Sequence, residues 1–535
     1  MPKNIQKWVD ARNYSPELLA AARVVLEDIR VGREPLRAVR AHPLPQGGYV
    51  PKHALIACYY DLLALGEWQP DSVLLARLRM KPMRSLSGVT TVTVLTKPHP
   101  CPGQCIFCPD DARMPKSYLP DEPGAARAFQ NQFDPFMQVR SRLDSYIATA
   151  HPIDKIELLI LGGTWSAYPR EYQETYILRC FDAMNGFDSS SLEEAQAANE
   201  KADSRNVGLV IETRPDEITP ALLAWLRRLG VTKVQMGAQS LDDNILALNL
   251  RGHTVADTER ACSLLRAGGF KIVLHWMPNL LGATLESDHA DFARLWRVCC
   301  PDEIKIYPTQ LLEGTGLYRK WQAGEYTPYT TQELIDLIAD IKPSIPRYCR
   351  VNRIIRDIPS PHIVAGNKRS SLRQDVLAEL ARRGQSCECI RCHEVGSRVV
   401  LPENLNLVDF AYPAGEAEEH FLSYRTPGDK ITAYLRLSMP HQEDTTSPLL
   451  EAIPELAGCA IVREVHVYGQ ALGVGHGQEG AAQHIGLGTN LLDEAARIAM
   501  QQGYKKLAVI SAIGTRKYYE SRGFSREDLY MIKEI

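Results

Sequence analysis

The feature that most constrains the fold is a series of short apolar runs that recurs along the first two thirds of the chain. The runs lie near residues 90, 156, 208, 233, 271 and 303, with helical segments between them. Short apolar runs rich in β-branched residues are typical of buried strands. Strands that alternate with helices favour parallel β/α units, and six strands are too few for a complete eight-stranded barrel. We therefore expect an α/β protein built on a partial (β/α)6 barrel.

Length and changes of pattern predict several domains. With 535 residues the chain has room for about two to four of them. Ser15 followed by proline is a typical helix start and opens a helical segment before the first strand. We expect a basic helical module over 1–88, the partial barrel over 89–340, a basic linker over 341–395 and a smaller α+β domain over 396–535.

Three cysteines follow the first strand with the spacing C-x-x-x-C-x-x-C, at Cys101, Cys105 and Cys108. Thiolates are the usual ligands of iron-sulfur clusters, and a cluster held by three of them leaves one iron open to another ligand. A structural zinc site needs a fourth ligand, which His99 could supply. A zinc knuckle or a disulfide loop therefore remains an alternative to the cluster.

The cysteine loop resembles the signature of the radical S-adenosylmethionine (SAM) enzymes, in which three cysteines hold a 4Fe-4S cluster and SAM binds the fourth iron. The resemblance implies that Gly162 and Gly163, which end an apolar run, approach the SAM amino group. Glu212, Arg214 and Gln239 stand at the carboxyl ends of later strands. Polar residues at those ends are what a β/α barrel site requires, so we expect these residues to bind SAM.

A second cysteine group, Cys387, Cys389 and Cys392, lies in the basic linker. Ligands this close together suit a small structural zinc site, whereas buried free thiols are the alternative. We expect Cys349 to be the fourth ligand, with two histidines as alternatives: His393 and His362.

The composition is that of an intracellular protein. The chain has 13 cysteines, an odd number gathered at two places, which suits metal binding in a reducing compartment better than disulfides. The sequence has neither an apolar targeting segment at its start nor an unbroken apolar run long enough for a membrane span. We expect a cytoplasmic protein without a membrane segment.

Positive charge is concentrated in two segments, although the net charge is only −3. Residues 1–90 hold 13 Lys and Arg against 8 Asp and Glu, and residues 341–398 hold 12 against 5. Such clusters can follow the phosphates of a nucleic acid, and a solvated charged surface is the alternative. Their uneven placement favours a polyanionic partner.

The last third of the chain carries a glycine loop that opens a helix, between Gln483 and Thr489. Gly486 and Gly488 would let the backbone approach phosphate oxygens, which the free amides of a helix start bind well. The loop resembles motif A of the GNAT acetyltransferases, whose backbone binds the pyrophosphate of acetyl-CoA. A nucleotide-binding P-loop is excluded because no Gly-Lys-Ser/Thr follows.

The pairing of a radical SAM barrel with a GNAT domain resembles the catalytic subunit of Elongator, which carboxymethylates the wobble uridine of tRNA. The resemblance implies that SAM yields a radical, that the radical activates the methyl group of acetyl-CoA, and that this carbon joins uridine C5. It also implies the residues that contact acetyl-CoA: Lys155, Glu464, Val465, His466, Val467, Gln483, Gly486, Leu487, Gly488, Thr489 and Tyr519. We expect Tyr518 and Tyr519 to act in catalysis, because a hydroxyl near the thioester can protonate the departing sulfur.

The alternative function is a protein lysine acetyltransferase that uses the GNAT domain alone, with Glu464 or a water-linked group as base. Neither an open-iron cluster nor two basic segments would be needed for that reaction. The preferred interpretation requires tRNA, acetyl-CoA and an electron donor as partners. It leaves open whether the chain forms homo-oligomers or binds accessory subunits.

Overall fold

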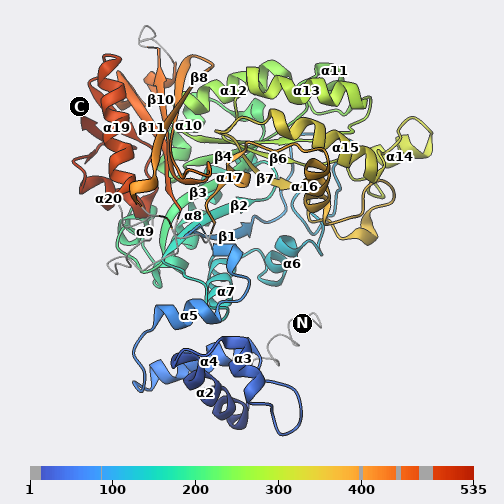
Figure 1. The fold of residues 1–535 in the computed structure, drawn as a ribbon. Coiled ribbons are helices and arrows are strands. Elements are labelled where there is room, and N and C mark those ends of the chain that lie inside the picture. The colour runs from blue at the N-terminus through green and yellow to red at the C-terminus, as the bar shows by residue number, and fades with distance from the viewer. Residues whose placement is uncertain (1–13, 86, 397–399, 401, 442–447, 469–485) are drawn as a thin grey trace.

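The structure is a computed structural model that describes residues 14–85, 87–396, 400, 402–441, 448–468 and 486–535. Figure 1 shows three parts in chain order: a small helical module near the N-terminus, a central sheet with surrounding helices, and a C-terminal part with a second sheet. None of the described helices is long and apolar enough to cross a membrane.

The N-terminal module consists of helices around their own apolar core. The first helix begins where the sequence predicts, with Ser15 accepting a hydrogen bond from the amide of Leu18 and a proline at the first helical position. The helices are α2 (Pro16–Arg30), α3 (Pro35–Ala41), α4 (Lys52–Ala64) and α5 (Ser72–Leu78). In Figure 1 the module stands apart from the two sheets, so it presents its surface separately from theirs.

The first sheet is parallel and has its strands in sequence order. It contains β1 (Thr90–Leu95), β2 (Lys155–Leu161), β3 (Arg205–Thr213), β4 (Lys233–Gln239), β5 (Lys271–Trp276), β6 (Glu303–Ile306) and β7 (Arg350–Ile354). The sheet therefore has one strand more than the six expected. β7 comes from the segment expected as a linker, and it pairs with the backbone groups that β6 would otherwise leave exposed at an edge.

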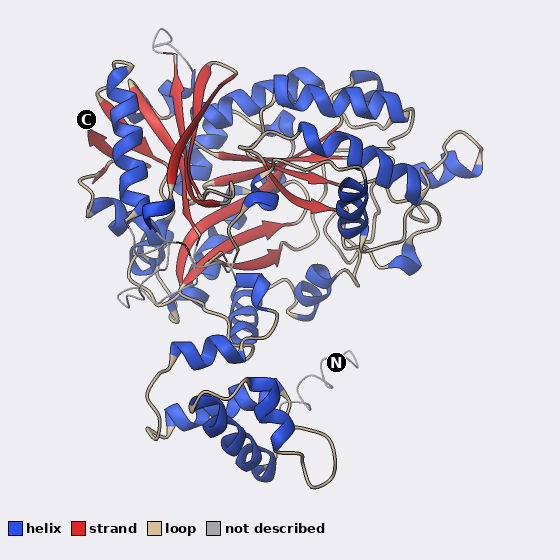
Figure 2. Cartoon of the chain, in the orientation of Figure 1, coloured by secondary structure: helices blue, strands red, loops and turns tan. Residues whose placement is uncertain are grey.

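Many of the helices in this part of the chain pack on the outside of this sheet, as Figure 2 shows. The helices between β1 and the second sheet are α6 (Pro123–Gln130), α7 (Pro135–Ile147), α8 (Arg170–Asn185), α9 (Leu192–Asn199), α10 (Pro220–Arg228), α11 (Asp243–Leu248), α12 (Val255–Ala267), α13 (Leu285–Val298), α14 (Gly316–Gln322), α15 (Thr331–Ile341), α16 (Leu372–Arg382) and α17 (Ile390–His393), and α14 lies away from the sheet (Figure 1). The arrangement confirms the predicted partial barrel.

The second sheet is mixed, with the strand order β13-β14-β12-β11-β10-β9-β8. Its only parallel pair among the described strands is β11 with β12. The elements are β8 (Asn406–Ala414), β9 (Ala417–Arg425), β10 (Ile431–Pro440), α18 (Pro448–Ala452), β11 (Cys459–Val467), α19 (Leu487–Gln501), β12 (Lys506–Val509), α20 (Arg516–Glu520), β13 (Ser525–Arg526) and β14 (Met531–Glu534). The predicted α+β domain is confirmed.

The second sheet covers the amino-terminal edge of the barrel. At the start of β5, Lys271 Nζ lies 3.2 Å from Glu464 Oε1 of β11. At the start of β7, Arg350 donates to the Tyr468 hydroxyl at 2.8 Å. The cysteine loop follows β1 and lies at the opposite, carboxyl-terminal edge. The two predicted chemical sites are thus on opposite ends of one barrel.

Candidate functional site

A single cavity of about 1290 Å³ extends between the two ends of the barrel. At one end its wall includes Cys108 and Gln239, and at the other it includes Val465, Gly488 and Tyr518. A typical site for one small ligand measures about 300 to 1,000 Å³. The cavity is therefore large enough for more than one ligand, and it brings both predicted sites into one space.

The cysteine loop contains one thiol, that of Cys105, whose surroundings favour the thiolate. The pKa of Cys105 is lowered to about 5, because the Cys108 thiol donates a hydrogen bond to it and the cation of Arg251 lies close. Arg251 Nη1 donates to Cys105 Sγ at 3.5 Å. Cys101 lies beside Thr164, with 3.5 Å between Sγ and Oγ1. Iron-sulfur clusters bind thiolates, so this donor set fits such a cluster.

The paired glycines after β2 are required by their surroundings. Gly162 has φ +145°, and a Cβ there would lie 1.8 Å from the Thr96 hydroxyl oxygen. Gly163 has φ +90°, and a Cβ there would lie 3.3 Å from the carbonyl oxygen of Lys116. The observed crowding is against protein atoms. Contact of this pair with the SAM amino group stays a prediction.

Two of the three polar residues at the strand ends face the cavity. Glu212 lines it and accepts a hydrogen bond from the Tyr118 hydroxyl at 2.7 Å. Gln239 lines it as well, and its buried Oε1 has no hydrogen-bond partner within the described residues. An orphaned acceptor of this kind fits a cationic ligand group such as an ammonium.

Arg214 does not face the cavity but is buried behind the cysteine loop. Its guanidinium pairs with Asp216 at 2.9 Å and donates to the carbonyl of Arg251 at 2.9 Å. A Cβ on Gly103 would lie 2.2 Å from its Nη1, so the guanidinium packs directly against the loop. These contacts suit support of the thiolates rather than direct contact with SAM.

At the other end of the cavity, α19 begins directly after Gly486, whose φ of +74° allows the sharp turn into the helix. Gly486, Gly488 and Thr489 line the cavity. Arg522 donates to Thr489 Oγ1 at 3.0 Å, which adds a cation to the positive end of the helix. A helix start with glycines and a cation is a suitable site for a phosphate group. Gln483 lies outside the described residues.

The two tyrosines of α20 have different surroundings. Tyr518 is partly exposed, and its hydroxyl would lie 2.5 Å from a Cβ on Gly488, so it stands over the start of α19. Arg522 lies over its ring at 3.6 Å. Tyr519 also lines the cavity but is largely buried, and burial raises the pKa of its hydroxyl well above the usual value. Tyr518 is therefore the more accessible of the two hydroxyls.

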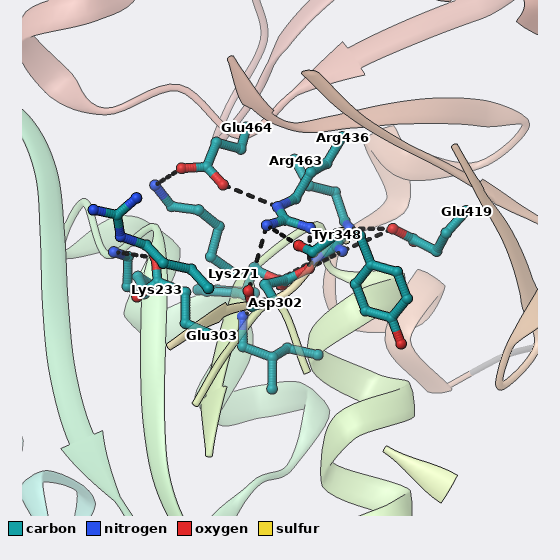
Figure 3. A network of polar contacts seen from close by, with 12 residues as sticks. Lys233, Lys271, Asp302, Glu303, Tyr348, Glu419, Arg436, Arg463 and Glu464 are labelled. Atoms are coloured by element: carbon teal, nitrogen blue, oxygen red, sulfur yellow. Dashed lines mark hydrogen bonds and ion pairs between the residues drawn. The ribbon is translucent and has the colours of Figure 1, made fainter. Parts of the chain in front are cut away.

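Glu464 is held in a network of buried charges where the barrel meets the second sheet, which Figure 3 shows. Its carboxylate contacts Lys271 Nζ at 3.2 Å and Arg436 Nε at 3.0 Å. Although burial acts in the opposite direction, these cations keep its pKa well below the usual range. A carboxylate paired twice is a weak base. Its contacts suit alignment of β11 better than proton abstraction.

His466 and Lys155 line the same part of the cavity. The pKa of His466 is lowered to about 4, chiefly by burial, so its imidazole is neutral at physiological pH. Its Nε2 is buried and has no hydrogen-bond partner within the described part of the chain. Burial also lowers the pKa of Lys155. Both residues thus line the cavity, and their contact with acetyl-CoA stays a prediction.

Sequence reasoning missed the polar lining of the barrel interior. Charged or amide side chains occupy alternate positions of three inner strands and face the cavity: Lys155 and Glu157 of β2, Lys233 and Gln235 of β4, and Glu303 and Lys305 of β6. Charged residues at a spacing of two within apolar strands are the signal that could have revealed a polar interior.

Three of the four cysteines expected in the second group lie together in the structure. The sulfurs of Cys387, Cys389 and Cys392 lie within 4.8 Å of one another. Lys342 Nζ lies 3.2 Å from Cys387 Sγ. Cys349 is buried nearby but does not belong to this group of three. The alternative ligands lie in other contacts, with His393 beside Asp429 and His362 beside Asp121.

The basic segment over 341–398 is largely neutralised by acidic partners. Arg356 is mostly buried and pairs with Glu122 at 2.9 Å, and Arg350 pairs with Glu394 at 2.9 Å. Further pairs join Arg347 to Glu388, Arg353 to Asp357, Arg369 to Asp375 and Arg383 to Asp336 and Asp340. Much of this charge therefore supports the fold rather than forming a free cationic surface.

Comparison with family models supports the barrel assignment. The Radical SAM superfamily model matches residues 99–293, and the Radical_SAM C-terminal domain model matches residues 301–382. Membership of this superfamily implies a 4Fe-4S cluster and SAM. The first match contains the cysteine loop and the strand ends that line the cavity.

Comparison with whole proteins extends over most of the chain. A tRNA uridine(34) acetyltransferase of Dehalococcoides mccartyi is 42% identical over 84% of this chain and 99% of that protein. Elongator complex protein 3 of Homo sapiens is 36% identical over 89% of each chain. The solved structure of archaeal Elp3 from Methanocaldococcus infernus, with an N-terminal deletion, covers 84% of this chain and 100% of its own at 37% identity and a TM-score of 0.72. With this fold, this cavity and these relatives, the chain belongs to the family of tRNA uridine(34) acetyltransferases and Elongator complex protein 3.

Proposed function

We propose that this chain modifies uridine 34, the wobble nucleotide of tRNA, by joining a carboxymethyl group derived from acetyl-CoA to carbon 5 of the base. The observation that carries the proposal is the single cavity that connects the cysteine loop with the glycine loop of α19. A lysine acetyltransferase would need only the α19 end of this cavity. The relatives named as tRNA uridine(34) acetyltransferases support tRNA as the substrate.

At the cysteine end, Cys101, Cys105 and Cys108 would hold the 4Fe-4S cluster. A cluster with bound SAM supplies one-electron cleavage of SAM and thereby removal of a hydrogen atom from the acyl methyl group. Arg251 stabilises the Cys105 thiolate through its 3.5 Å contact. The free Oε1 of Gln239 can accept a hydrogen bond from the SAM ammonium. An external electron donor is required for this chemistry.

At the other end, the start of α19 would bind the pyrophosphate of acetyl-CoA through its free amides. Val465 and Val467 of β11 line the cavity, where the extended arm of the ligand would lie along the strand. Tyr518 is the hydroxyl that can protonate the departing sulfur, because it is the more exposed of the two tyrosines. His466, with its unpartnered Nε2, can hydrogen-bond the thioester oxygen or a water molecule.

We also propose that Cys387, Cys389 and Cys392 bind a structural zinc ion. Three sulfurs within 4.8 Å of one another suit one ion, and thiolates are its usual ligands. The buried ammonium of Lys342 beside Cys387 would offset the negative charge of three thiolates on a divalent ion. Zinc content after dialysis, compared between the wild type and Cys389→Ser, tests this site.

The function is tested by anaerobic incubation of the protein with a reductant, SAM, acetyl-CoA and tRNA, followed by mass analysis of uridine 34. The expected product is a carboxymethylated base that is absent when SAM or acetyl-CoA is omitted. A lysine-containing peptide in the same mixture is the competing acceptor. An unmodified uridine together with an acetylated peptide would favour the lysine acetyltransferase instead.

A further inference from the structure

The interior of the barrel connects the two chemical sites, and charged and amide side chains stand among apolar ones in its wall. Strand β4 contributes Lys233 at its start and Gln239 at its end, and both line the cavity. At about 3.3 Å per residue these positions are ~20 Å apart. According to the proposed function, the acyl group enters at the amino-terminal ends of the strands, whereas SAM binds at their carboxyl-terminal ends. The interior lies between them.

Most charges in this interior are already paired. Lys233 Nζ contacts Glu157 and Glu303, each at 2.9 Å, and Lys271 contacts Glu464 (Figure 3). These pairs form the wall near the second sheet. They satisfy one another, so they provide polarity without an unmatched charge.

Lys305 differs from these lysines. Its ammonium donates to the amide oxygen of Gln235, and no carboxylate lies within 4 Å of it among the described residues. His275 Nε2 lies 3.2 Å from the same amide oxygen. Lys305 also lines the cavity. A buried ammonium has three donors, and one neutral acceptor leaves it able to bind an additional oxygen.

The surroundings of Lys305 keep the site polar without making it strongly cationic. Burial lowers the pKa of Lys305 to about 8 and holds the pKa of His275 well below its usual value. The carboxylates of Glu212 on β3 and Glu303 on β6 favour the charged form of Lys305, whereas the cations of Arg353 on β7 and Lys233 on β4 oppose it. The amine remains a hydrogen-bond donor in either protonation state, so it suits a small oxygen ligand.

We propose that the barrel interior is a passage for the two-carbon acyl unit and that Lys305 binds the acyl oxygen of this unit on its way to the SAM site. The inference deepens the proposed function and rests on it for the identity of the ligand. The recognised chemistry is a carbonyl or carboxylate oxygen on two carbons. Its source is either the acetyl end of the CoA arm or free acetate formed by hydrolysis.

The passage is first tested without the reaction, by the accessibility of two adjacent positions on β2. Leu159 lines the cavity, whereas Leu158 points to the other face of the strand and is fully buried. In the full chain, Leu159→Cys should react with iodoacetamide, a neutral reagent of acetyl size, about tenfold or more faster than Leu158→Cys. Peptide mass spectrometry separates these thiols from the native ones. Equal rates would show a closed interior and overturn the proposal.

The second test blocks the passage during turnover. Leu159→Trp should reduce uridine modification by about tenfold or more, whereas Leu159→Met should not. CoA release and 5′-deoxyadenosine formation should change by less than about twofold in either variant, since their sites lie at the ends of the barrel. Full modification by Leu159→Trp would overturn the passage. Absence of modification by the wild type would refute the proposed function instead, and the alkylation test would still decide whether the interior is open.

The third test addresses Lys305 and the form of the acyl unit. Lys305→Met should lower uridine modification by about tenfold. In the double variant Lys305→Met with Leu159→Cys, the new thiol should still be alkylated, which separates loss of acyl binding from collapse of the interior. Modification at the wild-type rate would remove the assignment of Lys305. With ¹³C-acetate added to unlabelled acetyl-CoA, label in uridine identifies free acetate as the source, and unlabelled product identifies the CoA-bound acetyl group.

Discussion

Replacement of Arg463 by methionine should destabilise the contact between the barrel and the second sheet. The side chain is fully buried and its guanidinium makes five hydrogen bonds, to Asp302, Glu419 and the carbonyl of Phe270. The two bonds to Asp302, at 2.6 and 2.8 Å, form a bidentate pair between the barrel and β11. Methionine keeps much of the length of the side chain but removes every donor.

The magnitude follows from what remains around the two carboxylates. Removing one partner of a buried ion pair costs about 3 to 5 kcal/mol, because the other charge is left without compensation. Asp302 would still contact Arg436 at 3.3 Å, and Glu419 would still contact Arg266 at 3.6 Å. These cations offset part of the loss, so we expect about 3 kcal/mol. That is a large fraction of the ~5 to 15 kcal/mol by which folded domains are stable.

Urea titration followed by tryptophan fluorescence measures the change in free energy of unfolding. Arg382→Met is the matched control, because Arg382 makes a bidentate pair with Glu379 on an exposed surface. The control should show no measurable change. A loss below about 1 kcal/mol for Arg463→Met would refute the view that this buried pair holds the two sheets together.

Four further outcomes are expected. Cys105→Ala should abolish iron-sulfur absorbance and formation of 5′-deoxyadenosine while acetyl-CoA binding persists, and remaining absorbance would contradict the cluster assignment. Gly488→Glu should weaken acetyl-CoA binding in titration calorimetry, because it places a carboxylate at the helix start and crowds Tyr518, whose hydroxyl lies 2.5 Å from the new Cβ; unchanged affinity would exclude this site. Burial raises the pKa of Asp288 to about 7, so the folded chain retains a proton that the unfolded chain releases near pH 4, and stability should fall as pH rises from about 4 to about 7. Asp288→Asn should remove that contribution, and identical pH slopes in urea titrations of both proteins would contradict it. Charge reversal of the exposed Arg37 and Arg40 should weaken tRNA binding and reduce the log-log salt slope by about 0.7 to 0.9 for each lost phosphate contact, so an unchanged slope in filter binding would exclude this module from the tRNA surface.

The sequence alone determined the features that depend on local pattern. Strand and helix periodicity predicted the β/α units, and Ser15 with the following proline marked the first helix correctly. The cysteine spacing and the glycine loop before α19 predicted a chemical site in each of the two segments, and the cavity reaches both. Such signals are readable because a loop, a cap or a strand is specified by residues close together in the chain.

Tertiary structure decided how these parts act together. The second sheet lies on the amino-terminal edge of the barrel, where Asp302 pairs with Arg463. These two residues lie far apart in the sequence, so no local pattern encodes their pairing. Because of this packing, Glu464, which the sequence offered as a candidate base, is a carboxylate paired with two cations. Lys305, in contrast, has an amide oxygen as its hydrogen-bond partner. A charged residue in the sequence does not reveal which residue it will pair with in the fold. Burial and contact between distant segments decide whether a charge is neutralised, structural or free to bind a ligand.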